Sequence, residues 1–212
     1  MTIKSLILQG EGEQLDFKNR ISNCEKIAKT LVAFANTKGG KLLVGVADNG
    51  TIKGVKNEEE EKYMLQRAGR QYCRPTIDVH FEEIFVEDKL ILLATVSESD
   101  TKPHYALSDD KKWWVYVRVQ DKSMLASKVM VDVFHQSNRP NGVFINYSDN
   151  AKELLGYLQA HAKSPIRELT KHLGLSRRKI QRILVNLIVA NVIEIHCDQG
   201  EEYFSLSLSD SS

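Results

Sequence analysis

VAFANTKGGKLLVGVADNGTIKGV, residues 32–55, is the stretch that decides the fold of the first part of this 212-residue chain. Its apolar residues follow helical spacing up to Gly39-Gly40, a pair that can end a helix. The apolar run Lys41–Ala47 then predicts a buried strand. Asp48-Asn49-Gly50 is a strong signal for a tight turn between two strands. Helix and strand signals therefore alternate within one short stretch.

The sequence on either side continues this alternation. Ser22-x-x-Glu25 matches a capping box at the start of the helix. Further regular segments are predicted as a largely solvated helix at 57–72, a hairpin of strands at 77–86 and 89–96, and a strand at 113–119. Helices and hairpins in succession predict an α+β domain with a mixed or antiparallel sheet, which we place at residues 1–135.

The pattern changes across residues 136–148, QSNRPNGVFINYS, where Asn, Gly, Pro and Ser gather. Beyond this linker a helix is predicted from Asp149. A second is predicted from Ser164-Pro165 to Gly174, and a third from Ser176. The segments VIEIHC and EYFSLSL then predict a β-hairpin. Three helices followed by a hairpin predict a C-terminal winged helix-turn-helix at residues 149–208.

Composition excludes several classes of protein. The chain has 29 Lys and Arg against 28 Asp and Glu, so no overall field attracts nucleic acid and any such affinity must be local. Cys24, Cys73 and Cys197 lie far apart without a C-x-x-C pair, which excludes a disulfide scaffold and a standard zinc finger and suits a reducing compartment. No run approaches the length of a membrane span. We therefore expect a cytoplasmic protein that does not enter a membrane.

The predicted third helix begins with a concentration of positive charge. Residues 163–182 hold seven basic residues against one acid, Glu168. In a helix-turn-helix this end of the second helix enters the major groove, where Arg can pair with guanine, Gln with adenine, and Lys and Ser with phosphates. The expected nucleic-acid contacts are Lys171, Ser176, Arg177, Arg178, Lys179, Gln181 and Arg182. The alternative is an ordinary solvated face, or a surface for protein contacts.

Three segments together resemble a known family: GEGEQLDFKNR (10–20), the stretch at 32–55, and YVRVQDKSMLAS (116–127). The most specific part is A-F-A-N-T-x-G-G followed by a strand ending in G-V-x-D. Over residues 8–128 the chain resembles the Schlafen-type, Alba-related DNA-binding domain, the AlbA_2 family. Members are often followed by a winged helix. Bacterial members are mostly described as transcription regulators and some as ATP-binding, whereas animal relatives include RNA endonucleases.

The resemblance also implies an acidic site. The family's acids fall on Glu11, Asp16 and Asp48, and such oxygen ligands suit Mg²⁺ or Mn²⁺. Two departures are visible: Glu13 competes with Glu11 for the first place, and Gln120 stands where the family has a glycine. A plainer interpretation is that Asp48 only forms a turn and that the glutamates are solvated.

Lys18 and Arg118 could line a phosphate-binding surface or be ordinary surface charges. The residues Asn36, Thr37, Gly39 and Gly40 are the candidates for binding a cofactor, since a glycine turn can cradle a phosphate. No G-x-x-x-x-G-K-[ST] motif occurs in the chain, so conventional P-loop chemistry is not expected. The alternative is that the two glycines provide only the turn between helix and strand.

These patterns predict a DNA-binding transcription regulator that needs no cofactor, has DNA or RNA as partner, and acts as a homodimer. A second hypothesis is a divalent-metal-dependent endoribonuclease using Glu11, Asp16 and Asp48 with Mg²⁺ or Mn²⁺. A third is a non-catalytic module that binds ATP or another nucleotide, or another protein.

Overall fold

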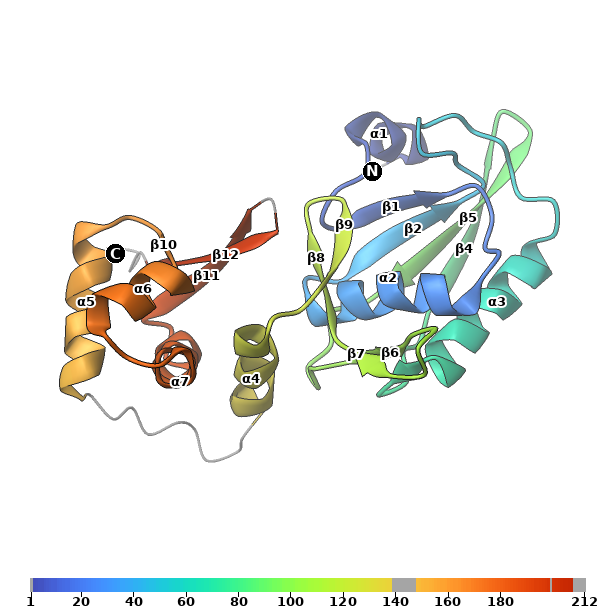
Figure 1. Ribbon diagram of the computed structural model, residues 1–212. Helices are drawn as coiled ribbons and strands as arrows, with labels where there is room; N and C mark the ends of the chain where they lie inside the picture. Colours follow the sequence, from blue (N-terminus) through green and yellow to red (C-terminus); the bar gives the residue numbers. More distant parts are fainter. Residues whose placement is uncertain (1, 139–147, 199, 208–212) are drawn as a thin grey trace. The chain divides into compact units, whose positions relative to one another are not determined.

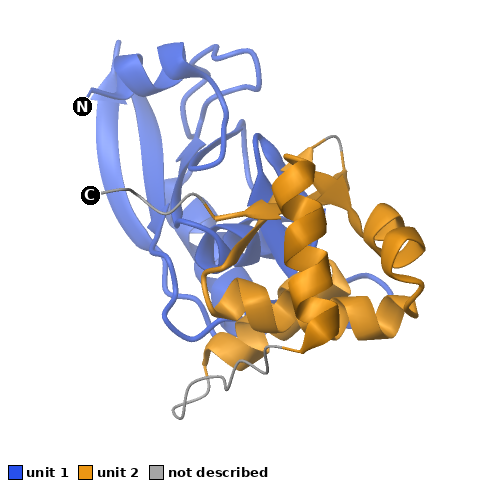
Figure 2. Cartoon of the chain, turned by 90° about the vertical axis from the view of Figure 1, so that its left-hand side faces the viewer, with its two compact units in different colours: residues 1–126 blue, residues 127–212 orange. Residues whose placement is uncertain are grey.

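The computed structural model describes residues 2–138, 148–198 and 200–207, and the chain divides into two compact units. Unit 1 comprises residues 1–126 and unit 2 residues 127–212 (Figure 2). The division follows Ala126 and so precedes the linker expected at 136–148, most of which lies outside the described residues. No helix in the described part of the chain is long and apolar enough to cross a membrane.

The described part of unit 1 is built around a four-stranded sheet with the strand order β1-β2-β5-β4. Its strands are β1 (Leu15–Lys18), β2 (Gly40–Val44), β4 (His80–Val86) and β5 (Lys89–Val96). β1 and β2 run parallel, with Asp16 paired to Leu42, whereas β5 is antiparallel to both of its neighbours. The predicted α+β class with a mixed sheet is therefore confirmed.

Helices cover both faces of this sheet (Figure 1). α2 (Cys24–Asn36) and α3 (Glu58–Gln71) pack on one face, where Leu31 and Leu65 share a core with Leu42 and Leu92. α1 (Ile3–Gln9) packs on the other face, where Leu6 meets Leu43. The sequence reasoning missed α1, although apolar residues at Ile3, Leu6 and Ile7 follow helical spacing.

Local signals placed most of these elements correctly. α2 runs up to the two glycines as expected, but its N-cap is Asn23, whose side chain accepts a hydrogen bond from Lys26 N, and not Ser22. The hairpin β4–β5 turns at Glu87-Asp88, both with positive φ, as a two-residue turn requires. The second strand expected after Asp48-Asn49-Gly50 is reduced to one bridge, between Val46 and Ile52.

The prediction of one continuous strand at 113–119 is wrong. It divides into β7 (Trp113–Trp114), which pairs with β6 (Tyr105–Leu107), and β8 (Tyr116–Val119), which pairs with β9 (Lys122–Leu125). β6 also pairs with β3 (Cys73–Arg74). The chain passes from one sheet to the other at the buried Val115. The carbonyl of Val115 accepts a hydrogen bond from Ala126 N, the residue that follows β9. Gln120, in the β8–β9 turn, has φ 54°, so it adopts the backbone conformation that favours glycine.

Unit 2 holds helices on a small antiparallel sheet with the strand order β10-β12-β11. Its elements in the described residues are α4 (Lys128–Ser137), α5 (Asp149–Ala160), β10 (Ser164–Pro165), α6 (Ile166–Leu173), α7 (Arg177–Val189), β11 (Ile193–Asp198) and β12 (Glu201–Leu206). Leu154, Leu169, Ile180, Leu184 and Phe204 form its core. α4 was not predicted as an element of its own.

The helix ends of unit 2 correct two details of the sequence reasoning. Ser148, and not Asp149, caps α5, its side chain accepting a hydrogen bond from Ala151 N. Ser164 is a fully buried residue of β10, and Pro165 takes the N-cap position of α6. Gly174 ends α6 with φ 62°, the left-handed conformation expected of a helix terminator.

Candidate nucleic-acid interface

The start of α7 presents a group of exposed basic side chains. Arg177, Arg178 and Lys179 occupy its first turn and Arg182 follows one turn later, all of them exposed. No salt bridge within the described residues engages Arg178, Lys179 or Arg182. The N-terminal end of a helix is also the positive end of its dipole, which favours phosphate there.

The connection between α6 and α7 fixes where these side chains lie. Only Gly174, Leu175 and Ser176 separate the two helices, and the left-handed Gly174 reverses the chain. Ser176 takes the N-cap position of α7 without a side-chain cap bond, and both Ser176 and Lys171 are exposed. Gln181 is half-buried. The structure thus gathers the residues expected to contact nucleic acid on α7 and the adjacent end of α6.

One acid lies beside this basic end. Glu202 on β12 is partly enclosed, and burial raises the pKa of its carboxyl. A hydrogen bond from the Ser127 side chain and the charge of Arg177 oppose that shift. Arg177 therefore has an acid within electrostatic reach, whereas no salt bridge among the described residues engages Arg178 or Lys179.

Glu11 and Asp16 form an acidic pair at the start of unit 1. The backbone N–H of Phe17 donates to Glu11 Oε1 at 2.8 Å, which holds the Glu11 side chain over β1. Burial raises the pKa of Glu11, and the neighbouring Asp16 carboxyl raises it further, while the Phe17 hydrogen bond opposes the shift. Two carboxyl groups this close cannot both ionise freely, so Glu11 retains its proton more readily than a free glutamate.

Asp16 is tied to two cations within its own unit. Arg118 Nη2 donates to Asp16 Oδ1 at 3.1 Å, and Lys18 Nζ lies 2.8 Å from Asp16 Oδ2 in an ion pair whose angles are not those of a hydrogen bond. The Arg118 guanidinium also donates to the carbonyls of Gly12 and Leu15, and its side chain is only 2% exposed. Arg118 therefore stabilises the start of β1. It is the buried counter-charge of Asp16, and the expectation that it contacts phosphate is corrected accordingly.

Lys18 has a similar internal role. Besides its pairing with Asp16, its ammonium donates to the carbonyl of Phe17 at 2.7 Å. Its side chain is 36% exposed, so it is more open to solvent than Arg118 but already neutralises a buried charge.

Asp48 does not join the two carboxylates. It is exposed in the turn that follows β2. Among the residues that the structure describes, no three His, Cys, Asp or Glu side chains lie together as a metal site requires. Glu11 and Asp16 have the oxygen donors that Mg²⁺ or Mn²⁺ prefers, but as they lie they are an incomplete ligand set.

The glycine turn is explained by packing. A Cβ on Gly40 would lie 2.3 Å from Cδ1 of Phe34, and one on Gly39, where φ is 69°, would lie 2.8 Å from Glu98 N. Asn36 is buried, donating to the carbonyls of His104 and Tyr116 and accepting from His104 N. Thr37 Oγ1 donates to the Ala33 carbonyl and accepts from Arg118 N. The side chains of Asn36 and Thr37 are thus used internally.

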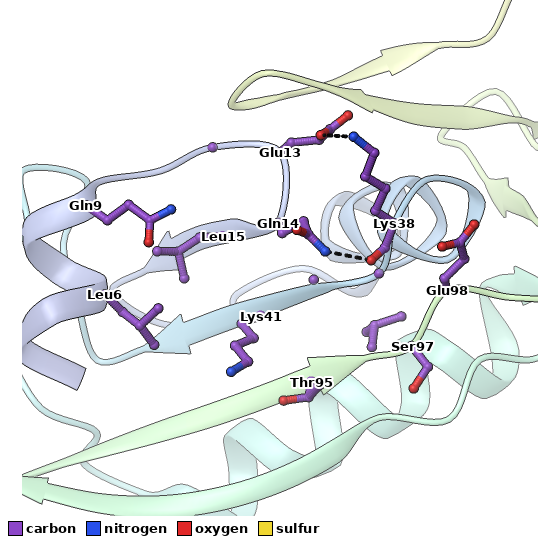
Figure 3. Close-up of a pocket in the computed structure, with 14 residues that line it drawn as sticks. Leu6, Gln9, Glu13, Gln14, Leu15, Lys38, Lys41, Thr95, Ser97 and Glu98 are labelled. Carbon is purple, nitrogen blue, oxygen red and sulfur yellow. Dashed lines mark hydrogen bonds and ion pairs between the residues drawn. The ribbon is translucent and has the colours of Figure 1, made fainter. Parts of the chain in front are cut away.

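A groove of about 510 Å³ adjoins this turn (Figure 3). It is lined by the glycines, by α1, and by the sheet positions Lys41 and Thr95, which are paired across β2 and β5. On one side, the Lys38 ammonium donates to the Glu13 carboxylate, and the Lys38 carbonyl accepts a hydrogen bond from the Gln14 side chain (Figure 3). Lys41 has no ion pair in the described part of the chain. The groove could not be expected from the sequence analysis, because one of its walls is formed by Leu6 and Gln9 of α1, a helix that was not predicted.

Comparisons with known structures give only distant similarity. The crystal structure of the DIP2311 protein from Corynebacterium diphtheriae is 17% identical with a TM-score of 0.44, over 74% of this chain and 33% of that one. The N-terminal domain of a protein from Nitrosomonas europaea described as related to the ATP-dependent DNA helicase RecG is 21% identical with a TM-score of 0.43, over 60% and 94% of the two chains. This chain thus spans about one third of the DIP2311 protein.

No curated protein matches the sequence. The family model for Schlafen, AlbA_2 matches residues 11–127, which is more than half of the chain and contains both Asp16 and Arg118. This range agrees with the resemblance drawn from the three sequence segments. The chain belongs to the Schlafen, AlbA_2 family.

Proposed function

We propose that the chain is a DNA-binding transcription regulator in which unit 2 is a winged helix-turn-helix that reads duplex DNA. The order of elements supports this: a helix, a short strand, two helices joined by a tight turn, and a hairpin that pairs with the short strand. In such a fold the second helix of the pair enters the major groove, which makes α7 the reading helix. Membership in the AlbA_2 family suggests nucleic acid as the partner, and unit 1 then binds nucleic acid or an effector.

The observation that carries this proposal is the exposed basic start of α7. We expect Arg177 and Arg178 to reach base edges and Lys171 and Lys179 to contact phosphates, since all four side chains are exposed. About four to six phosphate contacts give a slope of log K against log[salt] of about −4 to −5, at roughly −0.9 per contact. Loss of one base-reading arginine costs about 1–3 kcal/mol and relaxes preference at one position.

The test is fluorescence anisotropy with duplex DNA at several salt concentrations. The variant Arg177→Ala/Arg178→Ala/Lys179→Ala should bind more weakly and with a shallower salt slope. A matched control, Lys26→Ala/Lys56→Ala/Lys122→Ala, removes three exposed lysines from unit 1 and keeps α7 intact. Equal binding by the wild type and the α7 variant at every salt concentration would exclude α7 as the DNA reader, and a protein-interaction module would become the leading function.

A second candidate function is a Schlafen-type endoribonuclease that depends on a divalent metal. The observation that favours it is the Glu11–Asp16 carboxyl pair in the matched domain. This candidate requires Asp48 to approach the pair. Isothermal titration with Mn²⁺ should then show a site that both Asp16→Ala and Asp48→Ala remove, and unchanged Mn²⁺ binding in both variants eliminates it.

A further inference from the structure

α4 packs against the reading helix α7. Val129 of α4 is 2% exposed and belongs to the core of unit 2 together with Leu184 and Val185. Lys128, Asp132 and Gln136 of α4 line a groove of about 310 Å³ with Arg178, Gln181 and Arg182 of α7. The two helices are therefore in contact across this groove.

α4 covers the side of α7 that lies opposite Ile180 and Leu187, the side that carries Arg178, Arg182 and Val185. Ile180, Leu184 and Leu187 form the inner face of α7. Arg178 and Val185 lie on another face, since Val185 is five residues beyond Ile180 and thus about 140° around the helix at 3.6 residues per turn. A reading helix presents this outer face to DNA, because its inner face is held by the rest of the domain.

α4 also begins beside the start of α7. Ser127, the N-cap residue of α4, hydrogen-bonds Glu202 on β12, and Glu202 in turn lies within electrostatic reach of Arg177 in the first turn of α7. The end of α7 expected to reach base edges is thus the end next to which α4 is anchored.

The dimensions of DNA do not allow both helices into one groove. The major groove is about 12 Å wide, which admits a single helix of about 10–12 Å diameter. Two packed helices with axes about 8–10 Å apart are together about 18–22 Å wide. With α4 in place, α7 cannot enter the groove on its outer face.

We propose that α4 is an autoinhibitory cover on α7 and that duplex DNA binds the form in which α4 has left this face. The proposal rests on the proposed function of α7 as the DNA reader. The apparent Kd of the wild type is then the intrinsic Kd divided by the fraction of molecules with α7 uncovered. Any change that releases α4 raises DNA affinity without adding a contact to DNA.

The first test measures duplex DNA binding by full-length variants of α4. Val129→Asp places a charge in the α4–α7 contact and should tighten binding at least about tenfold, because it raises the uncovered fraction. Val131→Asp is the matched control: it adds the same charge to α4 at a position outside the unit 2 core. It should leave DNA binding close to that of the wild type.

Hydrogen exchange on the wild type provides a second measurement, which stands even if Val129→Asp fails to fold. Backbone amides of α4 should lose protection when duplex DNA is added. Two results would overturn the proposed cover while leaving α7 as the DNA reader. One is that α4 keeps its protection when DNA is bound, and the other is that a folded Val129→Asp binds DNA with unchanged affinity. Absence of DNA binding by both the wild type and Val129→Asp overturns the proposed function and the cover with it.

Discussion

Arg118 and Asp16 show how much one buried ion pair matters at the scale of a residue. The Asp16 side chain is 6% exposed, and its Oδ1 accepts a buried hydrogen bond from Arg118. Replacing Arg118 with Met should destabilise unit 1 by about 3–5 kcal/mol, because it removes the buried partner of Asp16, leaves the partly exposed Lys18 to offset the charge, and takes the Arg118 donors from the Gly12 and Leu15 carbonyls. Urea unfolding followed by tryptophan fluorescence measures this directly, since Trp113 and Trp114 both lie in unit 1.

The control for this variant is Lys4→Met, which breaks an ion pair with Glu87 in which both side chains are more than half exposed. Exposed pairs contribute little, so the unfolding curve should stay close to that of the wild type. Similar losses of unfolding free energy in Arg118→Met and Lys4→Met would show that the buried Asp16 pair contributes no more to stability than an exposed pair.

Glu11 makes a prediction about pH. Its pKa is raised in the folded chain, chiefly by burial, so the folded chain keeps this proton to higher pH than the unfolded chain does. The contribution of Glu11 to stability is therefore full below its ordinary pKa and is lost as the pH rises through the raised value. Glu11→Gln should stabilise unit 1 at neutral pH and have little effect at a pH below the ordinary glutamate pKa. Urea unfolding at both pH values checks this, and an equal effect at both would contradict it.

At the scale of elements, replacing a glycine with alanine should change stability in opposite directions in β2 and in α5. Gly40 at the start of β2 faces the Phe34 ring, so Gly40→Ala should cost about 1–3 kcal/mol through overpacking. Gly156 is exposed in the middle of α5, and a Cβ added there would meet no atom within 4 Å. Gly156→Ala should stabilise its helix by about 1 kcal/mol, because alanine has the higher helix propensity.

Tryptophan fluorescence reports the Gly40 variant, and thermal unfolding by circular dichroism reports the Gly156 variant. A Gly40→Ala protein as stable as the wild type would show that Phe34 moves aside. In that case packing would still account for Gly39, whose φ is 69° and whose added Cβ would lie 2.8 Å from Glu98 N, but would no longer account for Gly40.

The same scale shows what sequence could and could not predict. α2, α3, β2 and the β4–β5 hairpin carry their own caps, apolar periods and turn residues, so local patterns were enough. α4 was missed because its apolar face is short and is buried by α7, a segment distant along the chain. The partner of Asp16 was missed for the same reason, since Arg118 lies 102 positions away. Family resemblance suggested Asp16 as a metal ligand, and Arg118 was considered for phosphate contact or as an ordinary surface charge, whereas the geometry gives Arg118 a structural role.

At the scale of the whole molecule, the proposed regulator should be a homodimer. Winged-helix regulators that read two half-sites place them about 34–36 Å apart, or at a multiple of that distance, in keeping with two-fold symmetry. Light scattering should give twice the mass of one chain, free or bound to DNA. A monomer under both conditions would contradict the dimer and would favour DNA reading by a single α7.

The reach of Arg118 back to β1 has a consequence for how the protein is made. At a synthesis rate of about 5–20 residues per second, the 102 positions between Asp16 and Arg118 take about 5–20 s to add. During that time the nascent chain has its first strand, with Lys18 beside Asp16, but lacks Arg118, the buried one of the two cations that pair with Asp16. Unit 1 therefore completes its fold only when its last strands leave the ribosome, and a chain cut short before residue 118 is a natural target for chaperones and proteases.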